Sequence, residues 1–207
     1  RRRPAGDRVG LLPGPVVQLY LIRHPRPDVA PGLCYGRSDL ALAEDAVVVA
    51  AALRPLLPGN LPVFSSPLKR CRLLAEALHP APQFDQRLLE LDFGAWEMRS
   101  WADIGRAAID EWAADPEAYT PPGGESVGAM RARVANFLDD LAGSGLASAA
   151  LVAHAGVMKV CAAELLGIPA AKWFPMQFEF GAASLIDDAS GVYELIWHNR
   201  TLPLPPD

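Results

Sequence analysis

The chain has 207 residues, of which 51% are hydrophobic, and its formal net charge at pH 7 is −5. A chain of this length supports one sizeable hydrophobic core and is short for two. The negative charge argues against a nucleic acid partner, and no apolar run approaches the roughly 20 residues that cross a bilayer. We therefore predict one domain over residues 16–207, with no nucleic acid or membrane partner, preceded by a flexible arm over residues 1–15.

The cysteines indicate the redox environment. Cys34, Cys71 and Cys161 are odd in number and widely spaced, and no Cys-x-x-Cys pair indicates a metal or redox site. Because Cys71 and Cys161 fall within predicted helices, we interpret them as buried thiols in a reducing compartment. This pattern predicts a cytoplasmic protein.

Residues 16–22 form an apolar run rich in β-branched side chains, which stops at Arg23 and His24. Such a run predicts a buried strand. Ligands of α/β proteins collect at the carboxyl ends of strands, where side chains from several strands converge. An arginine followed by a histidine at this position therefore suggests a site for an anion.

Further helices and strands are predicted after the loop over residues 25–39. Ser66 and Pro67 are typical of the N-cap and first position of a helix, and His79 is expected to contact the carbonyl groups at the end of that helix. We expect helices over residues 46–57, 67–78, 101–119, 126–143 and 157–166, a short extended segment over residues 84–91, and strands over residues 61–64, 149–153, 178–186 and 192–197, the last two as a hairpin-like pair.

Two more polar side chains occupy positions like that of His24. Arg70 lies in the first turn of a predicted helix, and His154 directly follows a predicted strand. Arginine presents a planar set of donors to phosphate oxygens and stays charged at any working pH. A neutral histidine, with an unperturbed pKa of about 6.5, can attack phosphorus. Together with Arg23, these residues suit a phosphoryl group.

Five motifs, in this order, resemble those of the histidine phosphatase superfamily, which includes the cofactor-dependent phosphoglycerate mutases. They are Leu21-Ile22-Arg23-His24, Ser65-Ser66-Pro67-Leu68-Lys69-Arg70, Leu89-Glu90-Leu91-Asp92-Phe93-Gly94, Gly123-Gly124-Glu125-Ser126 and Val152-Ala153-His154-Ala155-Gly156. The resemblance runs from about residue 17 to residue 198. It implies a three-layer α/β/α sandwich around a mostly parallel sheet.

The resemblance also implies a role for each site residue. His24 is the expected nucleophile, which forms a phosphohistidine, and Glu90 is the expected proton donor. Arg23, Arg70 and His154 are expected to hold the phosphoryl group. No metal ion or other cofactor is implied.

The chain departs from the family pattern at two positions. Pro25 stands in place of the glycine that follows the histidine, and Ala30 stands where an asparagine is expected. Proline has no backbone N–H, so one phosphate contact is expected to come from another group. We predict Arg37 for this contact.

Two segments are similar to those of bacterial α-ribazole-5′-phosphate phosphatases of cobalamin biosynthesis. They are the loop over residues 23–39 and the Glu90 motif followed by Trp96. The resemblance implies a metal-independent phosphomonoesterase that acts on a small phosphorylated metabolite, α-ribazole 5′-phosphate before others. Two alternatives stay open, namely phosphoryl transfer of the phosphoglycerate mutase type and a non-catalytic module that binds a phosphorylated ligand. The oligomeric state also stays open, with a homodimer among the options.

Overall fold

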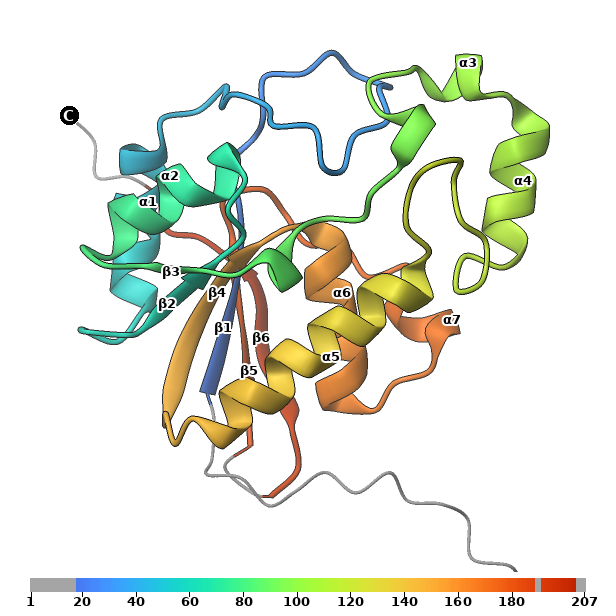
Figure 1. Cartoon of the computed structure of the whole chain (residues 1–207). Coiled ribbons are helices and arrows are strands. Elements are labelled where there is room, and N and C mark those ends of the chain that lie inside the picture. The colour runs from blue at the N-terminus through green and yellow to red at the C-terminus, as the bar shows by residue number, and fades with distance from the viewer. Residues whose placement is uncertain (1–17, 189–190, 204–207) are drawn as a thin grey trace, which may run out of the picture.

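The computed structural model describes residues 18–188 and 191–203 (Figure 1). In this part of the chain a six-stranded sheet has the order β3-β2-β4-β1-β5-β6. β2 pairs in parallel with β3 and β4, and β4 pairs in parallel with β1, whereas β5 is antiparallel to both β1 and β6. The strands are β1 (Gln18–Arg23), β2 (Val63–Ser65), β3 (Gln83–Phe84), β4 (Ser148–Ala153), β5 (Ala183–Asp187) and β6 (Glu194–Arg200).

Helices cover both faces of this sheet. α1 (Ala46–Leu53) and α2 (Lys69–Leu78) pack on one face, and α5 (Val127–Gly143) and α6 (Ala155–Leu166) pack on the other (Figure 1). The predicted three-layer sandwich around a mostly parallel sheet is thereby confirmed. The shorter helices are η1 (Arg54–Leu56), η2 (Gln86–Leu88), η3 (Gly94–Trp96), α3 (Trp101–Ile104), α4 (Arg106–Ala114) and α7 (Ala170–Trp173).

The side chains of β1 alternate between two hydrophobic clusters. Leu19 and Leu21 pack into the cluster that contains α5 and α6, while Tyr20 and Ile22 pack into the cluster that contains α1 and α2. Successive strand residues point to opposite faces, and both faces are covered here. This double burial explains why the apolar run is unbroken rather than alternating with polar residues.

The register of three strands places polar residues together at one edge. Arg23 of β1 pairs with Ala153 of β4, and Ser65 of β2 pairs with Val152 of β4. His24, His154 and Ser66 follow these strands directly, and because the strands are parallel they emerge at the same carboxyl edge. The predicted convergence of the two histidines is therefore a consequence of strand pairing.

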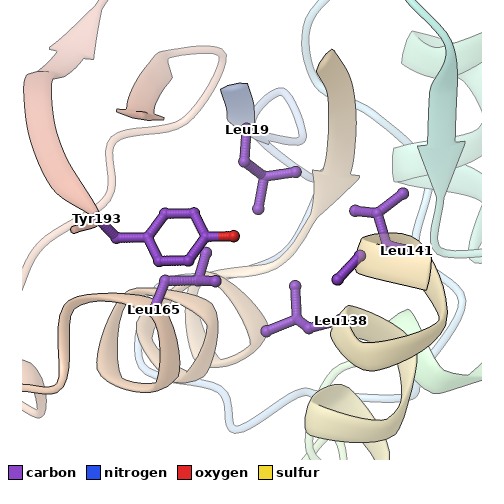
Figure 2. A pocket seen from close by; sticks show the side chains of 6 residues that line it. Leu19, Leu138, Leu141, Leu165 and Tyr193 are labelled. Carbon is purple, nitrogen blue, oxygen red and sulfur yellow. The ribbon is translucent and has the colours of Figure 1, made fainter. Parts of the chain in front are cut away.

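A small apolar pocket lies at the other end of β1 (Figure 2). Burial raises the pKa of the Tyr193 phenol, so this side chain stays neutral. An uncharged, mostly leucine-lined hollow does not suit an anion. Its lining residues are Leu19, Leu138, Leu141, Ala142, Leu165 and Tyr193.

The start of α2 differs from the prediction. The helix begins at Lys69 with Leu68 as its N-cap, and Ser66 does not cap it. The Ser66 hydroxyl lies 2.8 Å from a ring nitrogen of His154 instead. At the other end, His79 Nδ1 accepts a hydrogen bond from the backbone N–H of Ala81. The predicted contact of its side chain with the carbonyl groups at the helix end is not what the structure shows.

Other elements also differ from the prediction. The extended segment expected over 84–91 is a strand only at Gln83–Phe84 and is followed by η2. The helix expected over 101–119 is divided at Gly105, whose φ of 92° is incompatible with a right-handed helix, and α4 ends at Ala114. The strand expected from residue 178 begins at Ala183 because the preceding segment turns toward Arg23. In the described residues no helix is both long and apolar enough to cross a membrane. The arm predicted over residues 1–15 lies outside them.

Candidate active site

His24 is buried at the end of β1 with a defined tautomer. Its Nδ1 lies 2.7 Å from the carbonyl oxygen of Pro25. A carbonyl oxygen only accepts hydrogen bonds, so Nδ1 carries the proton and Nε2 keeps its lone pair. Burial and the nearby Arg70 charge hold the pKa of His24 well below its usual value. Although Pro25 lacks an N–H, its carbonyl group thus fixes the tautomer in which Nε2 carries no proton and keeps its lone pair.

His154 is the second buried histidine, and its ring centroid lies 5.1 Å from that of His24. Arg70 Nε donates to His154 Nδ1 at 3.2 Å, which leaves the proton on Nε2 to be donated to Ser66 Oγ at 2.8 Å. Burial first, and the Arg70 charge second, hold the pKa of His154 well below its usual value. Both histidines are therefore neutral at pH 7.

This neutrality predicts a pH dependence of stability. The unfolded chain binds protons on these histidines below about pH 6.5, whereas the folded chain does not. We therefore expect the free energy of unfolding to decrease as pH falls from about 6.5, which a thermal unfolding series measures. His24→Gln should flatten the slope; a stability that rises toward acid would contradict this prediction.

Arg70 is fully buried and is held by neutral groups. Its Nη1 donates to the carbonyl of Ser38 at 2.8 Å and its Nη2 to the carbonyl of Gly36 at 2.5 Å. No carboxylate of the described residues forms a salt bridge with it. Because a buried charge without a counter-ion is costly, this arrangement favours binding of an anion.

Arg23 lies beside the same edge. Its guanidinium stacks on the ring of Phe180 at 3.6 Å from the centroid, and Nη1 donates to the carbonyl of Phe178. Its Nε is buried and has no hydrogen-bond partner among the described residues. Burial lowers the pKa of Arg23 below its usual value. An unpaired buried donor next to an uncompensated cation is a second feature that suits an anion.

Glu90 is joined to the start of α6. Its Oε2 accepts from the backbone N–H of Gly156 at 3.0 Å, and its Oε1 accepts from the N–H of Leu91 at 3.0 Å. Gly156 lies two residues after His154, so this contact ties the carboxyl group to the edge that holds both histidines. A Cβ at position 156 would lie 2.2 Å from Glu90 Oε1, so the carboxyl group would have to move to accommodate a side chain there.

Gly156→Ala is therefore expected to displace the Glu90 carboxyl group. We predict a decrease in kcat of about tenfold or more, because proton transfer depends on position. The unfolding temperature should be unchanged or higher, since alanine favours helix over glycine. Gly143→Ala, at an open position at the end of α5, is the matched control. Equal kinetic constants for Gly156→Ala and the wild type would contradict the expected role of Glu90 as proton donor.

Arg37 is surrounded by acidic groups. It pairs with Glu125 at 3.2 Å and with Asp92 at 3.5 Å, and its Nε lies 3.5 Å from the carbonyl oxygen of Glu90. These contacts join Arg37 to the segment that carries Glu90. Its contact with phosphate stays a prediction.

Several supporting residues were not predicted from the sequence. Arg133 of α5 donates to the carbonyl of Glu90 and to both oxygens of Glu125, so the two arginines 37 and 133 share one carboxylate. Phe178 and Phe180 hold Arg23. Glu125 falls in a quoted motif and was available as a signal, whereas nothing in the sequence distinguishes the two phenylalanines. Within the described residues, no three His, Cys, Asp or Glu side chains gather to hold a metal ion.

The sequence profile of the histidine phosphatase superfamily (branch 1) matches residues 19–201. The chain belongs to the histidine phosphatase superfamily. An adenosylcobalamin/alpha-ribazole phosphatase of Salmonella typhimurium is 31% identical over 187 residues, covering 84% of this chain and 92% of that protein. Phosphoserine phosphatase 1 of Hydrogenobacter thermophilus is 28% identical over 182 residues, covering 83% and 86%.

A solved structure of a relative agrees with this assignment. The alpha-ribazole phosphatase from Shigella flexneri superposes with a TM-score of 0.79 at 26% identity, covering 91% of this chain and 100% of that one. The superfamily and these phosphatase relatives identify the present chain as a phosphatase.

Proposed function

We propose that this histidine phosphatase hydrolyses a small phosphate monoester through a phosphohistidine on His24, with α-ribazole 5′-phosphate as the substrate. The observation that carries the proposal is the neutral His24 imidazole, whose Nε2 keeps its lone pair, in a site with the buried Arg70 and the half-buried Arg23. Neither Arg23 nor Arg70 forms a salt bridge in the described residues. A phosphoryl dianion would supply the missing negative charge.

The first step forms the His24 Nε2–phosphorus bond and breaks the bond from phosphorus to the ester oxygen. Glu90, in its acid form, gives its proton to that oxygen, so the leaving group departs as an alcohol. Arg23 and Arg70 offset the negative charge on the phosphoryl oxygens without the need for a metal ion.

The second step reverses these roles. The Glu90 carboxylate takes a proton from water, whose oxygen attacks phosphorus and breaks the phosphorus–nitrogen bond. Orthophosphate leaves, and His24 returns to its neutral state with the proton on Nδ1, held by Pro25. The two displacements predict net retention of configuration at phosphorus.

The choice of substrate rests on similarity to relatives. The Salmonella and Shigella relatives are named for alpha-ribazole, and the Hydrogenobacter relative for phosphoserine. Members of one fold family use the same catalytic centre on different substrates, so similarity alone does not distinguish these two. The experiment therefore compares α-ribazole 5′-phosphate with phosphoserine.

The test measures orthophosphate release, with a chelator present, from α-ribazole 5′-phosphate, phosphoserine, 3-phosphoglycerate and a generic aryl phosphate. We expect the largest kcat/KM for α-ribazole 5′-phosphate and no effect of the chelator. A larger kcat/KM for phosphoserine would replace the substrate and keep the chemistry. Isomerisation of 3-phosphoglycerate in place of hydrolysis would favour a mutase, and tight binding of all four without turnover would favour a binding module.

A further inference from the structure

Glu97 lies at the end of η3, and five hydrogen bonds converge on its carboxylate. Oε2 accepts from Gly36 N at 3.0 Å, from Ser38 N at 3.1 Å and from Ser38 Oγ at 2.5 Å. Oε1 accepts from Arg37 N at 2.9 Å and from Phe93 N at 3.1 Å. Burial alone would raise the pKa of Glu97, but these hydrogen bonds outweigh it and lower the pKa below its usual value.

The segment held by Glu97, residues 35–38, contacts Arg70 directly. While its N–H groups donate to Glu97, the carbonyls of Gly36 and Ser38 accept from Arg70. The Arg70 guanidinium lies 5.7 Å from the centroid of the Tyr35 ring, and the charge of Arg23 acts on the Tyr35 phenol. The 35–38 segment is thus held between the Glu97 carboxylate and the Arg70 guanidinium.

Close packing leaves this segment little freedom to adopt another position. A Cβ on Gly36 would lie 1.8 Å from the carbonyl oxygen of Leu91 and 2.9 Å from the ring of Phe93. Residues 90–97 therefore support the 35–38 segment in two ways, through the Glu97 hydrogen bonds and through direct backbone contact. The same stretch begins with Glu90, so one piece of chain connects the expected proton donor to the arginine support.

We propose that Glu97 is a positioning residue that sets Arg70, and through it His154, for binding of the phosphoryl group. The inference rests on the proposed function, since it assigns Arg70 to the phosphoryl oxygens. Without the carboxylate, the N–H groups of residues 36–38 lose their common acceptor, and the carbonyls that direct the Arg70 guanidinium move with them. Glu97 itself touches no reacting atom in this account.

The test compares the wild type with Glu97→Gln, whose amide NH₂ cannot accept the hydrogen bonds that one carboxylate oxygen now receives. Calorimetric titration with inorganic phosphate measures the phosphoryl site without turnover. We expect the dissociation constant for phosphate to increase by about tenfold or more, and KM for an aryl phosphate to rise more than kcat falls. Glu164→Gln on α6, which removes the charge that pairs with Arg131 of α5, is the matched control and should leave both constants unchanged.

A double-mutant cycle with Arg70→Ala tests the route. If Glu97 acts through Arg70, Glu97→Gln adds little further loss of phosphate affinity in the Arg70→Ala background. Full additivity would overturn the proposal, as would wild-type phosphate affinity in Glu97→Gln with only a lower unfolding temperature. Should Glu97→Gln fail to fold, Glu97→Asp, which keeps the charge on a shorter side chain, is measured by the same criteria. A wild type that binds no phosphate would overturn the proposed function and this inference together, whereas the other outcomes concern Glu97 alone.

Discussion

Replacing His24 by alanine is expected to lower kcat for phosphate release by about 10⁴-fold or more, because the reaction loses the nitrogen that bonds to phosphorus. The arginines stay in place, so phosphate affinity should change much less than kcat. Steady-state release from an aryl phosphate and titration with inorganic phosphate measure the two effects separately.

The control for this variant is His79→Ala, which removes an imidazole that accepts from the backbone of Ala81 in the loop after α2, away from the site. It should retain the kinetic constants of the wild type. Thermal unfolding establishes that His24→Ala is folded at the assay temperature. A folded His24→Ala protein that releases phosphate at the wild-type rate would exclude His24 as the nucleophile.

Glu90→Gln is expected to reveal the proton donor through its dependence on the leaving group. The ribose hydroxyl of α-ribazole is a poor leaving group unless it is protonated, so hydrolysis of α-ribazole 5′-phosphate should slow by about 10²–10⁴-fold. A nitrophenolate leaves without protonation, so the formation of phosphohistidine from nitrophenyl phosphate should slow much less. Rapid mixing experiments that follow nitrophenolate release measure this step directly.

Glu164→Gln is again a suitable control, since Glu164 pairs with Arg131, which is not a predicted site residue. An equal loss for the alkyl and aryl substrates in Glu90→Gln would contradict the role of Glu90 as proton donor. Such a result would instead fit a purely structural role through the Gly156 contact.

The central part of the fold was predictable because its signals are local. An apolar run that ends in Arg23-His24 predicts a buried strand and its exit point, and the run before His154 predicts the same. Strand pairing then brings the two histidines together, because β1 and β4 are parallel neighbours whose last residues, Arg23 and Ala153, pair with each other. The position of Arg70 in the first turn of α2 was also correct, although the cap residue was not.

The support around the arginines was less predictable because it depends on contacts between residues far apart in sequence. Glu97 is about 60 positions from residues 36–38, whose N–H groups donate hydrogen bonds to it. Phe178 and Phe180 contact Arg23 from a segment that precedes β5. The apolar composition of this segment predicts a strand and does not indicate a contact with Arg23. Arg37 illustrates the same limit, since its acidic partners Asp92 and Glu125 come from two separate loops.

The central claim is that a phosphoryl group is transferred to His24, and a trapping experiment tests it most directly. Glu90→Gln protein is mixed with nitrophenyl phosphate, quenched in alkali to preserve phosphohistidine, and digested for mass spectrometry. We predict a phosphoryl group on the peptide that contains His24, at an occupancy that rises with the nitrophenolate burst, and none in His24→Ala. Nitrophenolate release with an unmodified His24 peptide at every time point would contradict the covalent mechanism.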